Sequence, residues 1–223
     1  MSEAAQNIAA LRAVMVAAEQ AAGRPAGAVN LVAVSKTHDA ETIRPFLQAG
    51  LRVFGENRVQ EAKGKWPELK QEFPDSELHL IGPLQTNKVR EAVALFDVIE
   101  TIDRPKLARA VAEEIARCGR APRCLVQVNV GREGQKAGID PDQAVALVEL
   151  CRREYALPVT GLMCIPPAEG DPAPYFRLLA DLAHKLGLSD ISMGMSGDFP
   201  TAIACGATHV RVGSALFGRR DNH

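Results

Sequence analysis

The sequence predicts an α/β fold, a (β/α)8 TIM barrel with an extra N-terminal helix. Short apolar segments rich in β-branched residues alternate with longer segments of helical period. Eight such strand candidates follow an opening amphipathic helix, and the helical segments between them supply the crossovers that parallel strands need. No linker or low-complexity segment interrupts the alternation. We therefore expect residues 1–223 to form a single domain.

The individual elements follow from local signals in chain order. The first helix is expected over residues 2–22, because Gly23 and Pro25 end it. Apolar β-rich runs predict strands at residues 30–36, 52–56, 78–81, 98–101, 124–130, 159–165, 190–195 and 209–212. Helical periodicity predicts helices at residues 42–49, 58–73 with a break at Pro67, 87–96, 105–117, 142–155, 174–186 and 199–205, and a short helix after Gly213.

An open doubly wound sheet is the structural alternative to the barrel. Such a sheet usually has fewer strands and a Gly-x-Gly-x-x-Gly turn after the first one. Here the first strand candidate runs into Ser35-Lys36-Thr37-His38 instead. The strand count and this turn favour the barrel, in which functional groups collect at the carboxyl ends of the strands.

The composition argues against several classes of function. The 223 residues are 47% hydrophobic, and 26 basic against 27 acidic residues give a net charge of -1. Without a Lys/Arg cluster, we expect binding neither to nucleic acid nor to an anionic membrane, and no apolar run reaches the ~18 residues of a membrane span. The five histidines and five cysteines show no metal-ligand spacing, so we expect no metal site. The N-terminal residues lack the features of a signal peptide, which makes a cytoplasmic protein with reduced thiols the expectation.

Lys36 is the first candidate for chemistry. It directly follows the apolar run Leu-Val-Ala-Val-Ser, at the expected mouth of the barrel. Loss of hydration there favours the neutral amine, which is a competent nucleophile toward an aldehyde. The alternative is that Lys36 extends to solvent at a strand end and has no function.

Two small-residue loops after the seventh and eighth strands predict a phosphate site. In this fold, phosphate commonly lies at those two loops. Ser196 with Gly197, and Gly213 with Ser214, offer hydroxyl donors and close approach to the backbone. Serine and glycine are also routine helix caps and turn residues, so the loops carry weight mainly as a pair with Lys36. Together they indicate a phosphorylated carbonyl compound.

Four further residues remain open from spacing alone. Arg211 shares a strand face with Gly213 and lies either inside the barrel or outside between helices. Asn57 could bind a ligand hydroxyl or cap the next helix. His79 alternates with apolar residues, which is typical of a satisfied core histidine. Lys136, in a Gly-rich loop after the fifth strand, could be a second amine near the mouth or a solvated side chain.

The chain resembles the pyridoxal phosphate homeostasis protein family, single-domain relatives of the alanine racemase N-terminal barrel with fold type III. The resemblance rests on ordered blocks: LVAVSK at 31–36, FGENRVQE at 54–61, HLIGPLQTNK at 79–88, GLM at 161–163, SMGMSGD at 192–198 and VRVGSALFG at 210–218. The family commonly has a tyrosine where this chain has Arg58.

The resemblance implies a cofactor and a role for each candidate residue. Lys36 would hold pyridoxal 5'-phosphate (PLP) as a Schiff base. The phosphate cradle would include Ser196, Gly213 and Ser214. Arg211 would lie near the pyridine nitrogen, and Asn57 near the ring hydroxyl.

The chemistry of these residues predicts binding without efficient turnover. PLP drives amino-acid chemistry best when its ring nitrogen is protonated, and an arginine cannot accept that proton. Racemisation also needs a second acid or base, which racemising relatives take from an added domain or partner chain. We therefore expect no catalytic residues, and a monomeric reservoir that delivers PLP to PLP-dependent apo-enzymes.

Two other functions stay open at this point. One is a small PLP-dependent racemase that uses a loop residue such as Lys136 as its second base. The other is a Schiff-base aldolase that needs no cofactor.

Overall fold

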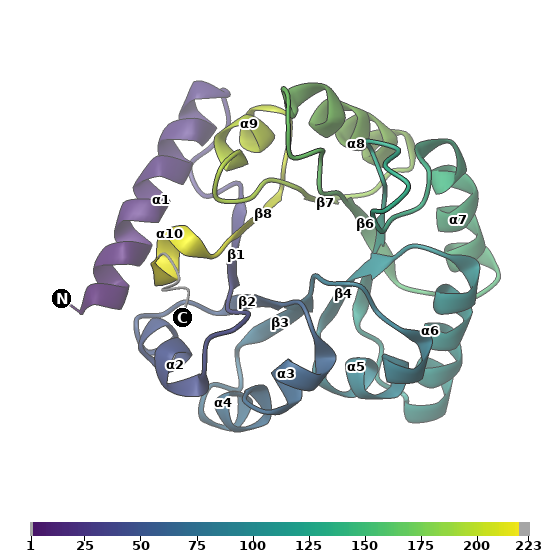
Figure 1. Cartoon of the computed structure of the whole chain (residues 1–223), viewed down its shortest axis with the longest axis horizontal. Coiled ribbons are helices and arrows are strands. Elements are labelled where there is room, and N and C mark those ends of the chain that lie inside the picture. Colours follow the sequence, from purple (N-terminus) through teal and green to yellow (C-terminus); the bar gives the residue numbers. More distant parts are fainter. Residues whose placement is uncertain (1, 219–223) are drawn as a thin grey trace.

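The computed structural model describes residues 2–218 and shows a closed barrel of eight parallel strands, joined in the order β1-β2-β3-β4-β5-β6-β7-β8 (Figure 1). Pairing of β1 with β8 closes the barrel and sets Val32 opposite Arg211. The predicted fold is therefore confirmed. The strands are β1 (Asn30–Val34), β2 (Val53–Glu56), β3 (Glu77–Leu80), β4 (Val98–Ile102), β5 (Arg123–Gln127), β6 (Val159–Met163), β7 (Asp190–Ser192) and β8 (His209–Val212).

Helices form a ring around the barrel (Figure 1). They are α1 (Glu3–Ala21), α2 (Ala40–Gln48), α3 (Val59–Lys63), α4 (Trp66–Glu72), the 3-10 helix η1 (Thr86–Lys88), α5 (Val89–Leu95), α6 (Pro105–Cys118), α7 (Pro141–Arg153), α8 (Ala173–Lys185), α9 (Phe199–Ala204) and α10 (Ser214–Phe217). The extra helix α1 packs against α9 and α10, and the Asn7 side chain donates a hydrogen bond to the Leu216 carbonyl at 2.9 Å.

Four strands end two or more residues earlier than the sequence predicts. The strands β1, β5, β6 and β7 stop before residues 36, 130, 165 and 195, where the apolar runs end. The chain turns sharply just beyond two of them, at Thr37 (φ 68°) and Gly194 (φ 94°). After β5, Val128 instead forms an isolated bridge to Ile139. These β-rich residues build the loops at the mouth of the barrel rather than the barrel itself.

The predicted break at Pro67 is wrong by a few residues. The break falls at Gly64 and Lys65, between α3 and α4. Pro67 lies in the first turn of α4, where its missing N–H leaves no helical hydrogen bond unmade. The proline therefore begins a helix rather than interrupting one.

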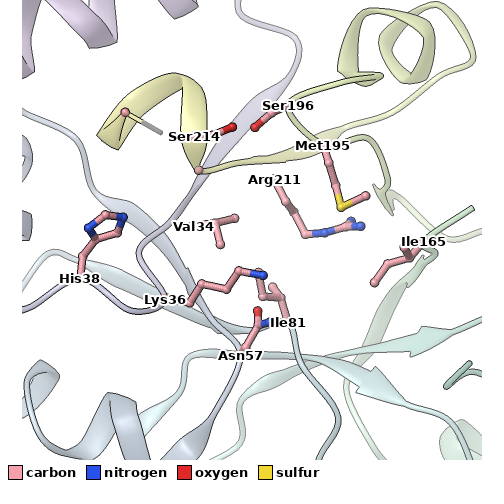
Figure 2. Close-up of a pocket in the computed structure, with 12 residues that line it drawn as sticks. Val34, Lys36, His38, Asn57, Ile81, Ile165, Met195, Ser196, Arg211 and Ser214 are labelled. Atoms are coloured by element: carbon pink, nitrogen blue, oxygen red, sulfur yellow. The ribbon is translucent and has the colours of Figure 1, made fainter. Parts of the chain in front are cut away.

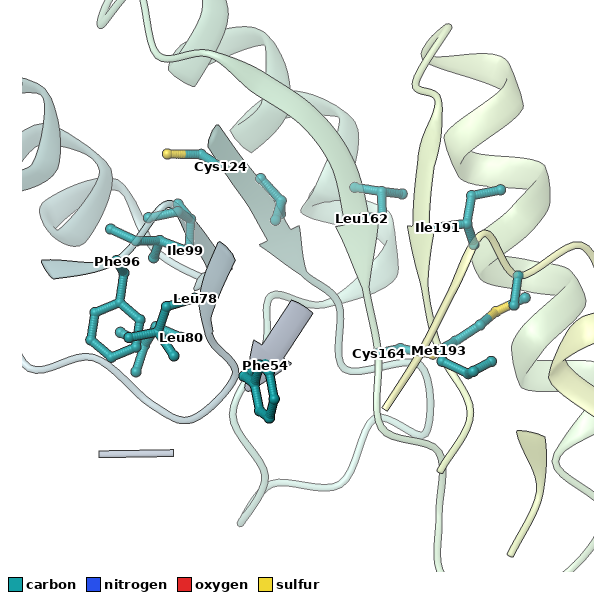
Figure 3. Packing of buried hydrophobic residues seen from close by; sticks show 14 of the residues in the cluster. Phe54, Leu78, Leu80, Phe96, Ile99, Cys124, Leu162, Cys164, Ile191 and Met193 are labelled. Atoms are coloured by element: carbon teal, nitrogen blue, oxygen red, sulfur yellow. The ribbon is translucent and has the colours of Figure 1, made fainter. Parts of the chain in front are cut away.

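The core lies mainly between the barrel and its helices. Leu78, Leu80 and Ile99 project outward from their strands and pack with Phe96 (Figure 3). Full burial of side chains of this size contributes about 1.5–3 kcal/mol each. A smaller cluster of Val98, Leu125 and Met163 alternates with the outward residues, as strand periodicity requires for the inside of the barrel. The barrel also buries the polar residues His79, Glu100, Ser192 and Arg211, and Arg211 lines the candidate site.

Candidate functional site

All six predicted site residues line one cavity at the carboxyl ends of the strands. The cavity has a volume of about 220 Å³, below the range of roughly 300–1,000 Å³ typical of small-molecule sites. It therefore suits one compact ligand. The predicted residues that line it are Lys36, Asn57, Ser196, Arg211, Gly213 and Ser214 (Figure 2).

Lys36 and Asn57 occupy one side of this cavity. Lys36 lies two residues beyond β1 and extends into the cavity toward Asn57, which directly follows β2 (Figure 2). The first residue before α3 is Arg58, and its side chain makes no capping hydrogen bond. The capping role considered for Asn57 is therefore not seen, and its side chain faces the cavity instead.

Ser196 and Ser214 occupy the opposite side. Their hydroxyls point toward one another from the loop after β7 and from the start of α10 (Figure 2). The first N–H groups of α10 have no acceptor within the helix. A Cβ on Gly213 would lie 3.1 Å from the Val34 carbonyl oxygen. The backbone here therefore packs so closely against β1 that glycine is favoured. The arrangement offers several donors to one anion.

Arg211 faces the inside of the barrel and not the space between the helices, two positions that its spacing in the sequence left open. Only 3% of the residue is exposed. Its Nη1 donates to the Ser192 hydroxyl and its Nη2 to the Cys164 carbonyl, both at 2.8 Å. Two hydrogen bonds to β7 and to the loop after β6 thus hold a permanent positive charge at the floor of the cavity.

A buried chain of charged groups continues from Arg211 toward the other end of the barrel. The Ser192 hydroxyl donates to Glu100 Oε2 at 2.5 Å, and Glu100 Oε1 lies 2.6 Å from His79 Nδ1. The other ring nitrogen of His79 lies 2.7 Å from Glu77. His79 is thus a satisfied core histidine, as its alternation with apolar residues indicates. Neither Glu100 nor Ser192 was predicted from the sequence as part of the site.

The two carboxylates keep His79 charged. Burial opposes the charged ring, but the hydrogen bonds to Glu100 and Glu77 outweigh it and raise the pKa of His79 to about 9. Burial likewise opposes the charge of Glu100, yet His79 and Arg211 lower the pKa of that carboxyl to about 2. The hydrogen bond with His79 also lowers the pKa of Glu77 to about 2.

Because of these buried charged groups, we expect the free energy of unfolding to fall at alkaline pH. An unfolded histidine has a pKa near 6.5, so the contribution of His79 is complete below that pH and is lost as pH rises to about 9. The expected loss is about 3 kcal/mol. The contributions of Glu77 and Glu100 are present above pH 4.5 and are lost as pH falls toward 2.

Urea unfolding between pH 6 and 10 measures this loss. His79→Gln should flatten the alkaline slope. A wild-type slope that is already flat would show that His79 is not charged in the folded protein.

Several residues that line the cavity were not predicted. They are Val34, His38, Ile81, Ile165, Met195 and Gly218. His38 follows Lys36 in the same loop and stacks on Phe217 of α10, with ring centroids 4.7 Å apart. A signal for His38 was present in its place after the first strand. Ile81, Ile165 and Met195 could not be distinguished from core residues by type.

Lys136 does not line this cavity. Its Nζ donates to the Pro166 carbonyl at 3.1 Å and lies 2.6 Å from Glu133. Within residues 2–218, no group of His, Cys, Asp or Glu side chains is arranged to hold a metal ion. Over the same residues, no helix has both the length and the apolar character needed to cross a bilayer.

Known proteins match the chain over nearly its whole length. Residues 6–221 match the family described as alanine racemase, N-terminal domain. A protein from Vibrio cholerae named pyridoxal phosphate homeostasis protein is 42% identical over 97% of this chain and 96% of its own length. A protein of the same name from Pseudomonas aeruginosa is 43% identical over 99% of this chain and 97% of its own length.

Solved structures agree with the sequence relatives. The structure of PipY from Synechococcus elongatus with PLP bound has a TM-score of 0.82 and 37% identity, covering 96% of this chain and all of that one. An alanine racemase from Clostridium difficile shares the fold, with a TM-score of 0.71 and 14% identity over 88% of this chain and 53% of that chain. The chain belongs to the alanine racemase N-terminal domain family and, within it, groups with the proteins named pyridoxal phosphate homeostasis protein.

Proposed function

We propose that this protein binds PLP as a Schiff base on Lys36 and holds it in reserve for PLP-dependent apo-enzymes. The observation that carries the proposal is the placement of the Lys36 amine and of two facing serine hydroxyls on opposite sides of one small cavity. Relatives named for pyridoxal phosphate homeostasis, and a PLP-bound structure of a relative, support the same reading.

The residues of the cavity fit the chemical groups of PLP. When bound, PLP supplies an aldehyde that combines with amines. Ser196, Ser214 and the backbone at Gly213 would hold the phosphate through N–H and O–H donors. The Asn57 amide would bind the ring hydroxyl beside the Lys36 amine. Arg211 would face the pyridine nitrogen from the cavity floor.

The same residues support storage rather than turnover. Arg211 donates hydrogen bonds only, so it cannot keep a proton on the pyridine nitrogen. Among the described lining residues, the titratable side chains are Lys36, His38 and Arg211. Lys36 and His38 belong to one loop, whereas racemisation needs an acid or base on each face of the substrate carbon. The proposed role is therefore to keep a reactive aldehyde out of solution until an apo-enzyme takes it.

Two assays test storage against catalysis on the PLP-loaded protein. Activation of an added PLP-dependent apo-enzyme measures release of the cofactor, and exchange of the alanine α-proton in deuterated water measures turnover. We expect activation and negligible exchange. Rapid exchange would instead establish a racemase, and a colourless protein that takes up no PLP would favour a cofactor-free aldolase.

Loss of one serine hydroxyl should weaken PLP binding specifically through the phosphate. We expect Ser214→Ala to raise the Kd for PLP by about 10- to 100-fold, because a hydrogen bond to a charged group is worth about 1.5–3 kcal/mol. The Kd for pyridoxal, which has no phosphate, should change little. Ser189→Ala, a change of an exposed serine before β7, is the matched control. An equal loss for pyridoxal would argue against a phosphate site at Ser214.

A further inference from the structure

The turn that carries Lys36 has an unusual conformation. The His38 N–H donates to the Ser35 carbonyl at 3.2 Å, so residues 35–38 form a β-turn with Lys36 and Thr37 at its centre. Thr37 has a φ of 68°. The third position of a type II turn requires such a positive φ and is normally filled by glycine or asparagine. A β-branched threonine there is strained, and strain of this kind persists only where surrounding contacts enforce it.

Lys65 supplies contacts at both ends of this turn. Its ammonium donates to the Ser35 carbonyl at 3.0 Å and to the His38 carbonyl at 2.7 Å. Only 7% of the residue is exposed, so these bonds are shielded from water. Lys65 is distant in sequence and reaches the turn because the chain breaks between α3 and α4.

Glu61 holds the middle of the same turn. Its Oε1 accepts a hydrogen bond from the Thr37 N–H, at the strained residue itself. The same oxygen accepts from Lys65 at 2.9 Å. Burial opposes the charge of Glu61, but the hydrogen bonds from Lys65 and the Thr37 N–H, together with nearby positive charge, lower the pKa of that carboxyl. The Lys65 ammonium and the Glu61 carboxylate therefore form hydrogen bonds to three backbone groups of the turn: the Ser35 carbonyl, the Thr37 N–H and the His38 carbonyl.

A buried lysine needs compensation, and here the compensation is local. Glu56 at the end of β2 lies 2.9 Å from the Lys65 ammonium and also accepts from the Ser35 hydroxyl at 2.6 Å. Burial raises the pKa of Glu56 despite these partners. A hydrophobic residue would fill the same space without such a cluster. The hydrogen bonds from the Lys65 ammonium to the two carbonyls of the turn explain why a buried lysine is present here.

We propose that Lys65 and Glu61 are positioning residues, which hold the strained turn and thereby aim the Lys36 amine into the cavity. The inference rests on the proposed function of Lys36 as the amine that binds PLP. Without these hydrogen bonds, Thr37 relaxes to a negative φ and the Lys36 side chain no longer points into the cavity. Ser196, Ser214 and Arg211 should stay in place, since no hydrogen bond or ion pair within residues 2–218 joins them to Lys65 or Glu61.

The test compares two ligands that differ at the carbon the amine attacks. Lys65→Met should raise the Kd for PLP about tenfold or more. Binding of pyridoxine 5'-phosphate, which carries an alcohol in place of the aldehyde, should change less than twofold. Lys63→Met is the matched control, because Lys63 lies on α3 and pairs with Glu91 on the surface. That control should bind both ligands as the wild type does.

A second substitution distinguishes positioning from general damage. Glycine adopts a positive φ without strain, so Lys65→Met combined with Thr37→Gly should recover PLP binding to within about threefold of the wild type. Wild-type PLP affinity in Lys65→Met overturns the proposal. So does a loss that Thr37→Gly fails to recover, or one that is equal for both ligands.

Folding is checked by circular dichroism on each variant. If Lys65→Met does not fold, Glu61→Gln replaces it, because that side chain is partly exposed and keeps its shape. Its PLP affinity should fall severalfold and recover with Thr37→Gly, and an unchanged affinity overturns the proposal. Failure of the wild type itself to take up PLP would count against the proposed function, not against the geometry of the turn.

Discussion

Lys36→Ala is expected to abolish the visible absorption of the PLP-loaded protein. The proposed covalent bond needs the Lys36 amine, and the hydrogen bonds from the serines to the phosphate alone would leave the cofactor weakly and reversibly held. The free energy of unfolding should change by no more than about 1 kcal/mol, because the side chain lies in a cavity and contributes little to the core. Absorption spectra of dialysed protein and urea unfolding measure the two effects.

Lys136→Ala is the control for this variant. Lys136 lies in the loop after β5, and its amine is bound to Pro166 and Glu133 rather than lining the cavity. The variant should keep the wild-type spectrum. A Lys36→Ala protein that stays yellow after dialysis would contradict the assignment of the lysine.

Glu100→Gln is expected to destabilise the fold by about 3–5 kcal/mol at pH 7. Glu100 is fully buried and is the carboxylate between His79 and Arg211. Removal of one charge from a buried ionic group leaves the others without compensation, and that is costly. His79 can release its proton, but Arg211 cannot.

Glu77→Gln provides the comparison at the half-exposed end of the same chain. The Glu77 side chain is 35% exposed, so water can solvate the groups that lose the carboxylate as a partner. We therefore expect the free energy of unfolding to fall by about 1 kcal/mol. Urea unfolding at pH 7 measures both variants. A loss below 1 kcal/mol for Glu100→Gln would show that the buried chain does not depend on its central charge.

The sequence was sufficient to predict the barrel because hydrophobic periodicity reports burial directly. Outward-facing residues such as Leu78 and Leu80 are apolar and buried against helices, and each strand is short and β-rich. The ends of the strands were less predictable. Met195 and Ile165 continue the apolar pattern of their strands, but they lie in loops at the cavity, where the same side chains serve as its walls.

The candidate site was predictable where function and position in the chain coincide. Lys36, Ser196 and Ser214 each follow a strand, and parallel strands bring their carboxyl ends together. The contacts among buried polar groups were not predictable, because they join residues far apart in sequence. Ser192 and Glu100 are 92 positions apart, and no local pattern links them.

The lysine that holds the turn shows the same limit. Lysine is usually a surface residue, so its type gave no sign that Lys65 is buried. The helix break that turns it inward was expected at Pro67 instead. Only the fold shows that its ammonium reaches the carbonyls on either side of Lys36 and Thr37. Side chains that act on a distant backbone leave no periodicity in the sequence.

Borohydride reduction of the PLP-incubated protein, followed by peptide mass mapping, tests the central claim most directly. Reduction fixes the Schiff base as a stable pyridoxyl adduct, so the modified residue can be identified by mass. We expect one adduct, on the peptide that contains Lys36, and disappearance of the visible absorption as it forms. An adduct on Lys136 or another lysine, or none at all, would contradict the account.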